Sequence, residues 1–179
     1  LRRTIEQLDF YVSYYAAGRL KDTEIYAHTP FEVQFDSAHA QVLDAPLYIS
    51  AVDEEHFRLS LDAENANTIT YSSENTSFYG GKIQFEKTFS YGEWIETPWL
   101  RIKIKNKGLN PDQAMDFFFK FRHPRQLVAE YSRKLRARKK DENSSIVNVT
   151  LTGPNHQKSA TFLKMLSETF ILANLEMIN

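Results

Sequence analysis

The sequence predicts an α+β fold: an antiparallel, β-rich, sandwich-like insertion on an α/β layer, with two C-terminal helices, the last one long. Three observations lead to this fold class. Short apolar segments that alternate with polar residues fill positions 28–123. The pattern becomes helical at Pro124. A last strand, ended by Gly153 and Pro154, leads into a helical pattern that continues to Asn179.

The N-terminal two thirds of the chain are predicted to be strands. Apolar residues alternate along 8–15, which indicates a half-buried strand, and Gly18 closes it. A short extended piece follows at 24–26, and the alternation resumes after Pro30. The expected strands from there on are 31–36, 47–52, 56–61, 68–71, 82–86, 99–105 and 115–121. Short strands spaced roughly every 8 to 15 residues indicate a sandwich or a curled antiparallel sheet.

The C-terminal third is predicted to be helix, strand and helix. Proline is well placed in a first helical turn, so 124–140 is expected to be a helix with a cationic end. Positions 146–151 alternate as a strand, and Asn155 is a suitable N-cap for the last helix. If the last strand pairs in parallel, it forms the edge of an α/β layer. Residues 1–27 and 124–179 then form an α/β base unit, and 28–123 form the β-rich inserted module.

The last helix carries apolar residues at the spacing of a coiled-coil seam. The candidates for oligomer or helix packing are Leu163, Leu166, Phe170, Ala173 and Met177. Burying five such side chains stabilises a helix by about 7 to 15 kcal/mol, whereas ordering about 25 residues of backbone opposes folding by about 25 to 50 kcal/mol. The helix is therefore expected to pack against a partner, with an ordinary core helix as the alternative. No glycine or proline ends it, which predicts that the chain is a piece of a longer one.

Composition and motifs exclude several function classes. Lys and Arg total 22 against 23 Asp and Glu, so no net charge points to nucleic acid. Cysteine is absent, the five histidines lack ligand spacing, and Gly80-Gly81-Lys82 does not complete a phosphate-binding loop. We therefore expect no cofactor, no metal and no catalytic residues in this segment. No apolar run is long enough to span a bilayer.

Two groups of residues are candidate binding sites. Aromatic side chains gather between positions 78 and 99, and flat rings on a β-surface are a platform for sugar stacking as well as a common core filling. The candidate glycan contacts are Tyr79, Trp94 and Trp99. The basic run after the first C-terminal helix offers candidate anion contacts at Arg133, Arg136 and Arg138, with a solvated helix end as the alternative.

Both ends of the chain resemble the polysaccharide co-polymerase, or chain-length determinant, family. The segments that carry the resemblance are SIVNVTLTGPNHQKSATFLKML at 145–166, NLEMIN at 174–179 and LDFYVSY at 8–14. The last is similar to the early strand of the branch that often carries a cytoplasmic tyrosine-kinase domain. The chain departs from the family at His156, where proline is common, and at Lys164, where asparagine is common.

The resemblance implies an inner-membrane protein with one transmembrane helix on each side of a periplasmic domain of α/β type. Such domains assemble into rings through long helices. With a polymerase, the rings control the chain length of capsular polysaccharide or exopolysaccharide, or support its export. The implied partners are further copies of the chain, the polymerase or export machinery, the nascent glycan and the inner membrane. The segment itself is implied to be non-enzymatic, although the full-length protein can carry the kinase domain.

Two other functions are open from the residues alone. One is a carbohydrate-binding β-sandwich module of a sugar-active enzyme, which the aromatic residues favour. The other is a glycosidase, which requires Glu93 or Glu96 to face a second carboxylate across a cleft.

Overall fold

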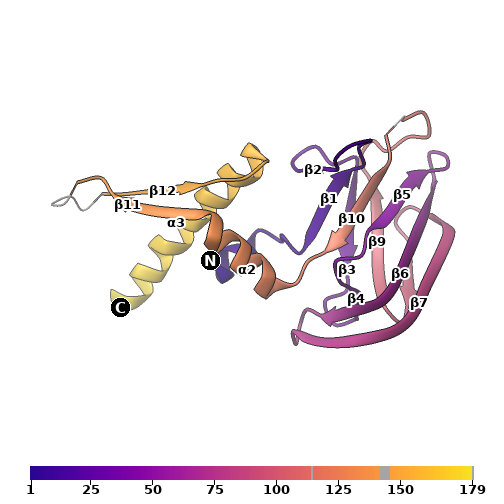
Figure 1. Ribbon diagram of the computed structural model, residues 1–179, viewed down its shortest axis with the longest axis horizontal. Helices are drawn as coiled ribbons and strands as arrows, with labels where there is room; N and C mark the ends of the chain where they lie inside the picture. The colour runs from indigo at the N-terminus through magenta and orange to yellow at the C-terminus, as the bar shows by residue number, and fades with distance from the viewer. Residues whose placement is uncertain (114, 142–145, 179) are drawn as a thin grey trace. The chain divides into compact units, whose positions relative to one another are not determined.

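The structure is a computed structural model that describes residues 1–113, 115–141 and 146–178. The chain divides into two compact units (Figure 1). Unit 1 comprises Leu1–Tyr11 with Pro124–Asn179, and unit 2 comprises Val12–His123. Residues 1–27 were expected in the base unit, but in the structure the strands between positions 12 and 25 pair within unit 2.

Unit 2 contains two antiparallel sheets. The seven-stranded sheet has the order β2-β1-β10-β5-β6-β4, and β7 pairs with β6. Its strands are β1 (Val12–Ala16), β2 (Thr23–Ile25), β4 (Gln41–Val42), β5 (Leu47–Ala51), β6 (His56–Thr70), β7 (Asn75–Ser90) and β10 (Phe117–Phe121). The three-stranded sheet consists of β3 (Phe31–Phe35), β9 (Leu100–Asn106) and β8 (Trp94–Thr97), in the order β3-β9-β8.

The core of unit 2 lies between these two sheets because apolar residues alternate along each strand. Phe31 on β3 is fully buried, with its ring centroid 6.5 Å from that of Phe117 and 6.0 Å from that of Phe119, both on β10. Phe35 on β3 meets Phe121 on β10 edge-on at 5.3 Å. The intervening residues of β10 point away from this core. The alternation therefore gives each sheet an outer face.

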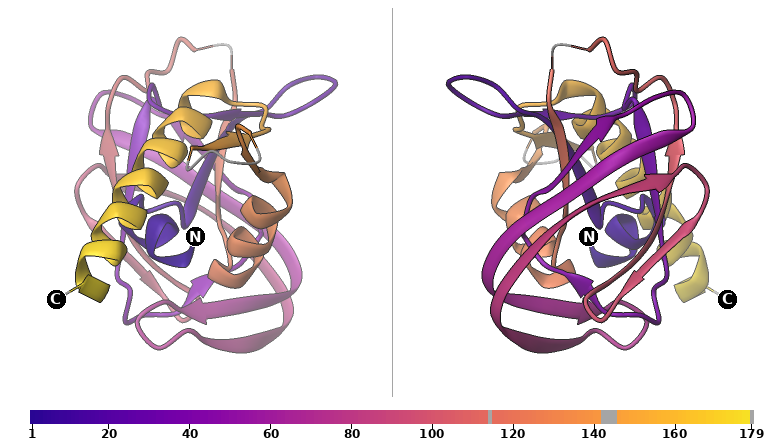
Figure 2. Two further views of the ribbon diagram at one scale, coloured as in Figure 1. Left: turned by 90° about the vertical axis from the view of Figure 1, so that its left-hand side faces the viewer. Right: turned by 90° about the vertical axis from the view of Figure 1, so that its right-hand side faces the viewer.

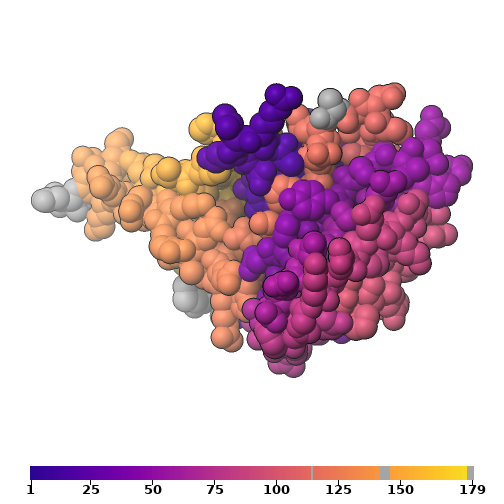
Figure 3. Space-filling model, turned by 45° about the vertical axis from the view of Figure 1, so that its right-hand side comes forward, coloured from indigo at the N-terminus to yellow at the C-terminus, as the bar shows by residue number. Residues whose placement is uncertain are grey.

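Strands β6 and β7 form one long hairpin of 15 and 16 residues (Figure 2). They lie side by side across the surface of unit 2 (Figure 3). The register shifts between Glu64 and Ala66, at Asn65, whose φ is 52°. The Asn65 carboxamide accepts a hydrogen bond from the Gly81 amide of β7 at 3.3 Å. The alternation of apolar residues predicted three separate short strands here, because polar residues at the bulge interrupt it.

The described residues of unit 1 form three helices and one hairpin. These elements are α1 (Arg2–Gln7), α2 (Pro124–Lys134), β11 (Leu135–Lys139), β12 (Val147–Leu151) and α3 (His156–Ile178). Three aromatic rings form the centre of the unit. The Phe162 ring of α3 lies 4.3 Å from that of Tyr131 on α2 and 6.3 Å from that of Phe10. Asn155 caps α3, since its Oδ1 accepts a hydrogen bond from the Lys158 amide at 3.0 Å.

The prediction of an α/β layer is wrong. The structure is mostly β, with 46% strand and 22% helix, three antiparallel sheets and three helices. β12 pairs with β11 in an antiparallel ladder, so the described part of unit 1 has no parallel sheet. The helix expected at 124–140 ends at Lys134 because the residues after it pair with β12. The strand expected at 8–15 is confined to Val12–Ala16, and α1 precedes it.

Candidate functional site

A row of side chains crosses the outer face of the seven-stranded sheet. The pairing places Tyr15 of β1 opposite Phe118 of β10, Phe118 opposite Tyr48 of β5, Tyr48 opposite Ser60 of β6, and Ser60 opposite Glu86 of β7. The Tyr15 and Phe118 rings stack at 4.8 Å, and the Phe118 and Tyr48 rings lie 5.2 Å apart. The row thus changes from aromatic to polar across the sheet.

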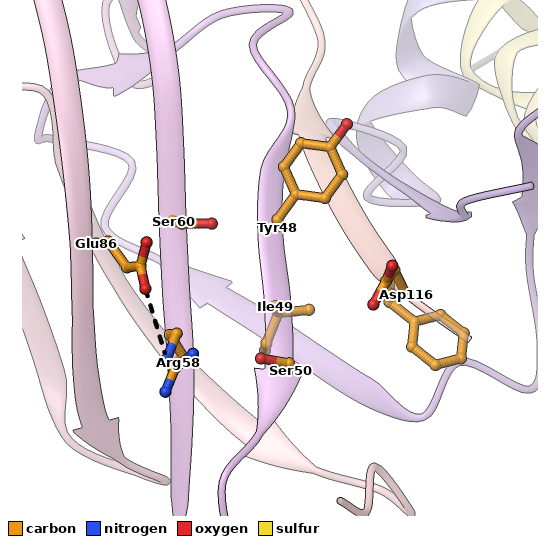
Figure 4. Close-up of a pocket in the computed structure, with 8 residues that line it drawn as sticks. Tyr48, Ile49, Ser50, Arg58, Ser60, Glu86 and Asp116 are labelled. Carbon is orange, nitrogen blue, oxygen red and sulfur yellow. Dashed lines mark ion pairs between the residues drawn. The ribbon is translucent and has the colours of Figure 1, made fainter. Parts of the chain in front are cut away.

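A depression of about 280 Å³ lies where the aromatic part of this row meets the polar part (Figure 4). Tyr48, which is 43% exposed, stands at one side of it. The polar side chains that line it are Ser50, Arg58, Ser60, Glu86 and Asp116. Arg58 Nε lies 3.7 Å from Glu86 Oε1 across neighbouring strands.

The depression offers an aromatic surface beside both hydrogen-bond donors and acceptors. Arg58 donates, Glu86 and Asp116 accept when ionised, and the serine hydroxyls do both. A sugar ring matches this arrangement, because its C–H face packs on an aromatic ring while its hydroxyls need donors and acceptors. No pattern in the sequence predicted this candidate site. Its residues come from four strands, and only their register brings them together.

The three predicted glycan contacts do not form one surface. Trp99 is 5% exposed and packs edge-on against Phe85 at 5.4 Å, so its ring is part of the core. Tyr79 is half-buried on β7, opposite Ala66. Trp94, on β8, is 48% exposed. Trp94 is thus the more exposed of the two tryptophans, and Arg101 Cζ and Lys103 Nζ each lie 5.2 Å from its ring centroid.

Of the two carboxylates that a glycosidase was expected to use, Glu96 lies in an ion-pair network on the three-stranded sheet. Arg101 of β9 bonds to Asp36 and pairs with Glu96 Oε2 at 3.1 Å. The pKa of Asp36 is held below its usual range, chiefly by a hydrogen bond from the Ala38 amide and also by Arg101, against an opposing effect of burial. Arg101 thus bridges Asp36 and Glu96, so a cation of the same surface neutralises the Glu96 carboxylate. Glu93 is exposed, next to the turn at Gly92.

The predicted anion contacts separate into two groups. Arg133 lies in the last turn of α2, where its Nε donates to the Ala129 carbonyl at 3.3 Å. Arg136 and Arg138 lie on β11, opposite Thr150 and Asn148, and therefore share one face of the hairpin. All three are exposed.

The predicted seam of α3 is offset from the stripe that the helix buries. Phe162 is fully buried and Thr169 is 8% exposed, and neither belongs to the predicted seam. Of the seam residues, Leu163, Leu166 and Ala173 are half-buried. Phe170 is 66% exposed, and the side chain of Met177 lies outside the described residues.

The described residues contain no group of three or more His, Asp or Glu side chains that could hold a metal ion. No helix in the described ranges is both long and apolar enough to cross a bilayer. No protein-family model and no curated protein matches the chain.

Proposed function

We propose that this chain is a periplasmic scaffold domain of an inner-membrane polysaccharide co-polymerase. In this role the domain catalyses no reaction. Copies of it assemble through α3 and, with the polymerase or export machinery, control the chain length or export of a capsular polysaccharide or exopolysaccharide. The exposed apolar surface of α3 is the observation that carries the proposal.

The second half of α3 exposes four large apolar side chains. Phe170 is 66% exposed, Ile171 54%, Leu172 52% and Leu175 54%. Successive residues of an α-helix point about 100° apart, so these residues cover more than one side of the helix. A second copy that packs on one side leaves another side open for a third copy. A patch of this kind favours assembly of several copies over a closed pair.

The segment that resembles the co-polymerase family also supports the proposal. Its residues form β12, the break at Gly153 and Pro154, and α3 as one continuous strand-turn-helix. Asn155 caps the helix although His156 stands where the family commonly has proline. The departure at His156 therefore leaves the start of the long helix intact.

Sedimentation velocity over a range of protein concentrations tests the assembly. We expect the sedimentation coefficient of the wild-type chain to rise with concentration, and Phe170→Glu to abolish the rise because it places a charge in the apolar patch. Val52→Glu in unit 2 is the matched control, since Val52 is also exposed, at 42%. A wild-type chain that stays monomeric with its helices intact by circular dichroism would contradict assembly through α3.

The length of the surface polysaccharide tests the function itself. Phe170→Glu, introduced into the gene in its source organism, is expected to change the length distribution of the polysaccharide on an electrophoretic gel. Val52→Glu should leave it as in wild type. An unchanged distribution in a strain that lacks the gene entirely would refute the co-polymerase role.

The depression beside Tyr48 favours a second function, a carbohydrate-binding module of a sugar-active enzyme. Calorimetric titration with a panel of neutral oligosaccharides tests it. We expect binding that Tyr48→Ala removes and Phe78→Ala retains, because Phe78 is an exposed aromatic residue of the same unit outside the depression. If no member of the panel binds, this second function fails while the assembly through α3 is unaffected.

A further inference from the structure

The outer face of the three-stranded sheet carries a line of cations on β9. Leu100, Ile102 and Ile104 are fully buried, so the alternating residues Arg101, Lys103 and Lys105 point outward. Equivalent atoms two residues apart on a strand are separated by about 7 Å. The two lysines therefore present neighbouring ammonium groups on one surface.

These cations differ in whether a carboxylate neutralises them. Arg101 is paired with Asp36 and Glu96. Glu32 lies opposite Lys105 in the β3–β9 ladder, but its carboxylate lies 3.9 Å from Lys107 Nζ. Within the described ranges neither Lys103 nor Lys105 has an ion pair. Both ammonium groups therefore remain available to an anion from outside the chain.

A cavity of about 360 Å³ opens beside the two lysines. It is lined by Gln34, Tyr91, Gly92, Lys103, Lys105 and Asn106, and no carboxylate lines it. The Asn106 side chain is committed to its own loop, since its Oδ1 accepts from the Gly108 and Leu109 amides and its Nδ2 donates to the Leu109 carbonyl. The Gln34 carboxamide makes no hydrogen bond with the described residues and is free for a ligand hydroxyl.

Packing and backbone pairing hold part of the cavity wall in place. Tyr91 packs against Phe57 with ring centroids 4.9 Å apart. The Gly92 amide donates to the Ile104 carbonyl at 2.8 Å, which fixes the loop against β9. Lys103 Nζ lies 5.2 Å from the Trp94 ring centroid, so a movement of this ammonium group is expected to change the fluorescence of Trp94. Cavities of this volume are typical of small-ligand sites.

We propose that this cavity binds a carboxylate-bearing sugar residue of an acidic polysaccharide. The carboxylate lies between the Lys103 and Lys105 ammonium groups, and a ring hydroxyl bonds to Gln34. Unpaired cations, a free carboxamide and the lack of a lining carboxylate together select an acidic sugar over a neutral one. The inference rests on the proposed function for its biological setting, and it names the chemical class of the glycan.

Titration of the chain with trigalacturonate tests the site. Trp94 fluorescence is the readout, because a bound carboxylate draws the Lys103 ammonium from the indole, while the buried Trp99 supplies a constant background. We expect saturable binding of trigalacturonate that weakens as salt is added. Maltotriose, a neutral trisaccharide, tests whether binding needs a carboxylate. Inorganic phosphate, an anion without a sugar ring, tests whether binding needs a sugar. Equal binding of maltotriose, or binding of phosphate alone, would overturn the proposal.

Lysine variants locate the site. Lys103→Gln and Lys105→Gln are each expected to weaken trigalacturonate binding by about tenfold or more, since each removes a charge-assisted hydrogen bond. Lys107→Gln is the matched control, because Lys107 is a neighbouring lysine that pairs with Glu32 and lies outside the cavity. It should change the affinity less than about twofold. Equal losses in all three variants would show a non-specific charge effect and overturn the site.

Failure of this inference is distinguishable from failure of the proposed function. Binding is measured on the purified chain, whereas the proposed function is measured by assembly and by polysaccharide length in cells. If trigalacturonate does not bind but Phe170→Glu still changes polysaccharide length, the acidic-sugar site is wrong and the scaffold role stands. Calorimetric titration provides a second readout for variants that alter Trp94 fluorescence.

Discussion

Replacement of Phe162 by alanine is expected to destabilise unit 1, whereas the same change at Phe170 is not. Both residues lie on α3, but Phe162 is 0% exposed and Phe170 is 66% exposed. A buried phenylalanine ring removes about 150 to 200 Å² from water, which at about 25 cal/mol per Å² stabilises the fold by about 4 to 5 kcal/mol. This agrees with the about 3 to 5 kcal/mol typical of such truncations.

For Phe170 the same calculation gives a small number. About a third of its surface is buried, which corresponds to roughly 1 to 1.5 kcal/mol. Alanine regains about 0.5 kcal/mol of that because it favours a helix more than phenylalanine does. The expected net loss of unfolding free energy for Phe170→Ala is therefore under about 1 kcal/mol.

Urea unfolding followed by two signals measures the difference. Far-ultraviolet circular dichroism follows mainly unit 1, to which the three described helices belong, and tryptophan fluorescence follows unit 2, which holds both tryptophans. Phe162→Ala should shift the dichroism transition to much lower urea, and Phe170→Ala should leave it nearly unchanged. An equal shift in both variants, measured on monomeric protein, would refute the division of α3 into a buried and an exposed side.

Three further predictions concern unit 2. Gln41→Met should lower the unfolding free energy by about 2 to 4 kcal/mol. The buried Gln41 side chain donates to the Asp36 and Arg101 carbonyls and accepts from the Arg101 amide, and methionine makes none of these hydrogen bonds. The shift of the urea midpoint measures the loss. Asp36→Asn should lower the unfolding free energy near neutral pH and progressively less in acid. The reason is that the pKa of Asp36 is lower in the folded state, so its carboxylate stabilises the fold only while it is ionised. Urea unfolding at several pH values measures this effect, and a pH-independent difference from wild type would contradict it. Gly18→Ala should destabilise the β1–β2 connection, since the added Cβ would lie 2.1 Å from the Lys21 carbonyl oxygen; a thermal midpoint equal to wild type would contradict it.

The sequence was sufficient to predict the strands whose alternation is uninterrupted. Strands expected at 31–36, 47–52 and 99–105 correspond to β3, β5 and β9 to within one residue at each end. In these segments one face is buried and the other is solvated, so the two-residue period is visible in the sequence itself. Strand β11 cannot be recognised from this two-residue period. Leu135 continues the apolar stripe of α2, and the alternating residues after it are mostly cationic.

The candidate binding surfaces were less predictable, because they depend on pairing between distant strands. Trp94 and Trp99 lie five residues apart, yet one is 48% exposed and the other 5%. Trp94 begins β8, whereas Trp99 lies with Pro98 in the turn between β8 and β9, so strand alternation does not relate their faces. Likewise, the meeting of Tyr48 with Ser60 and Glu86 follows from the register of three strands. Sequence spacing carries no direct record of that register.

The long β6–β7 hairpin leaves one edge of the seven-stranded sheet open, because β7 pairs only with β6 among the described strands. An open edge invites strand addition by another molecule and, in crowded conditions, fibrous aggregation. Here two features disfavour pairing of the edge with another strand. Lys82, Glu86 and Lys87 place exposed charges on β7, and the bulge at Asn65 interrupts the regular ladder of the hairpin. Protection of this kind disfavours uncontrolled polymerisation through the sandwich. It is therefore compatible with the proposed function, in which copies of the chain assemble through α3 instead.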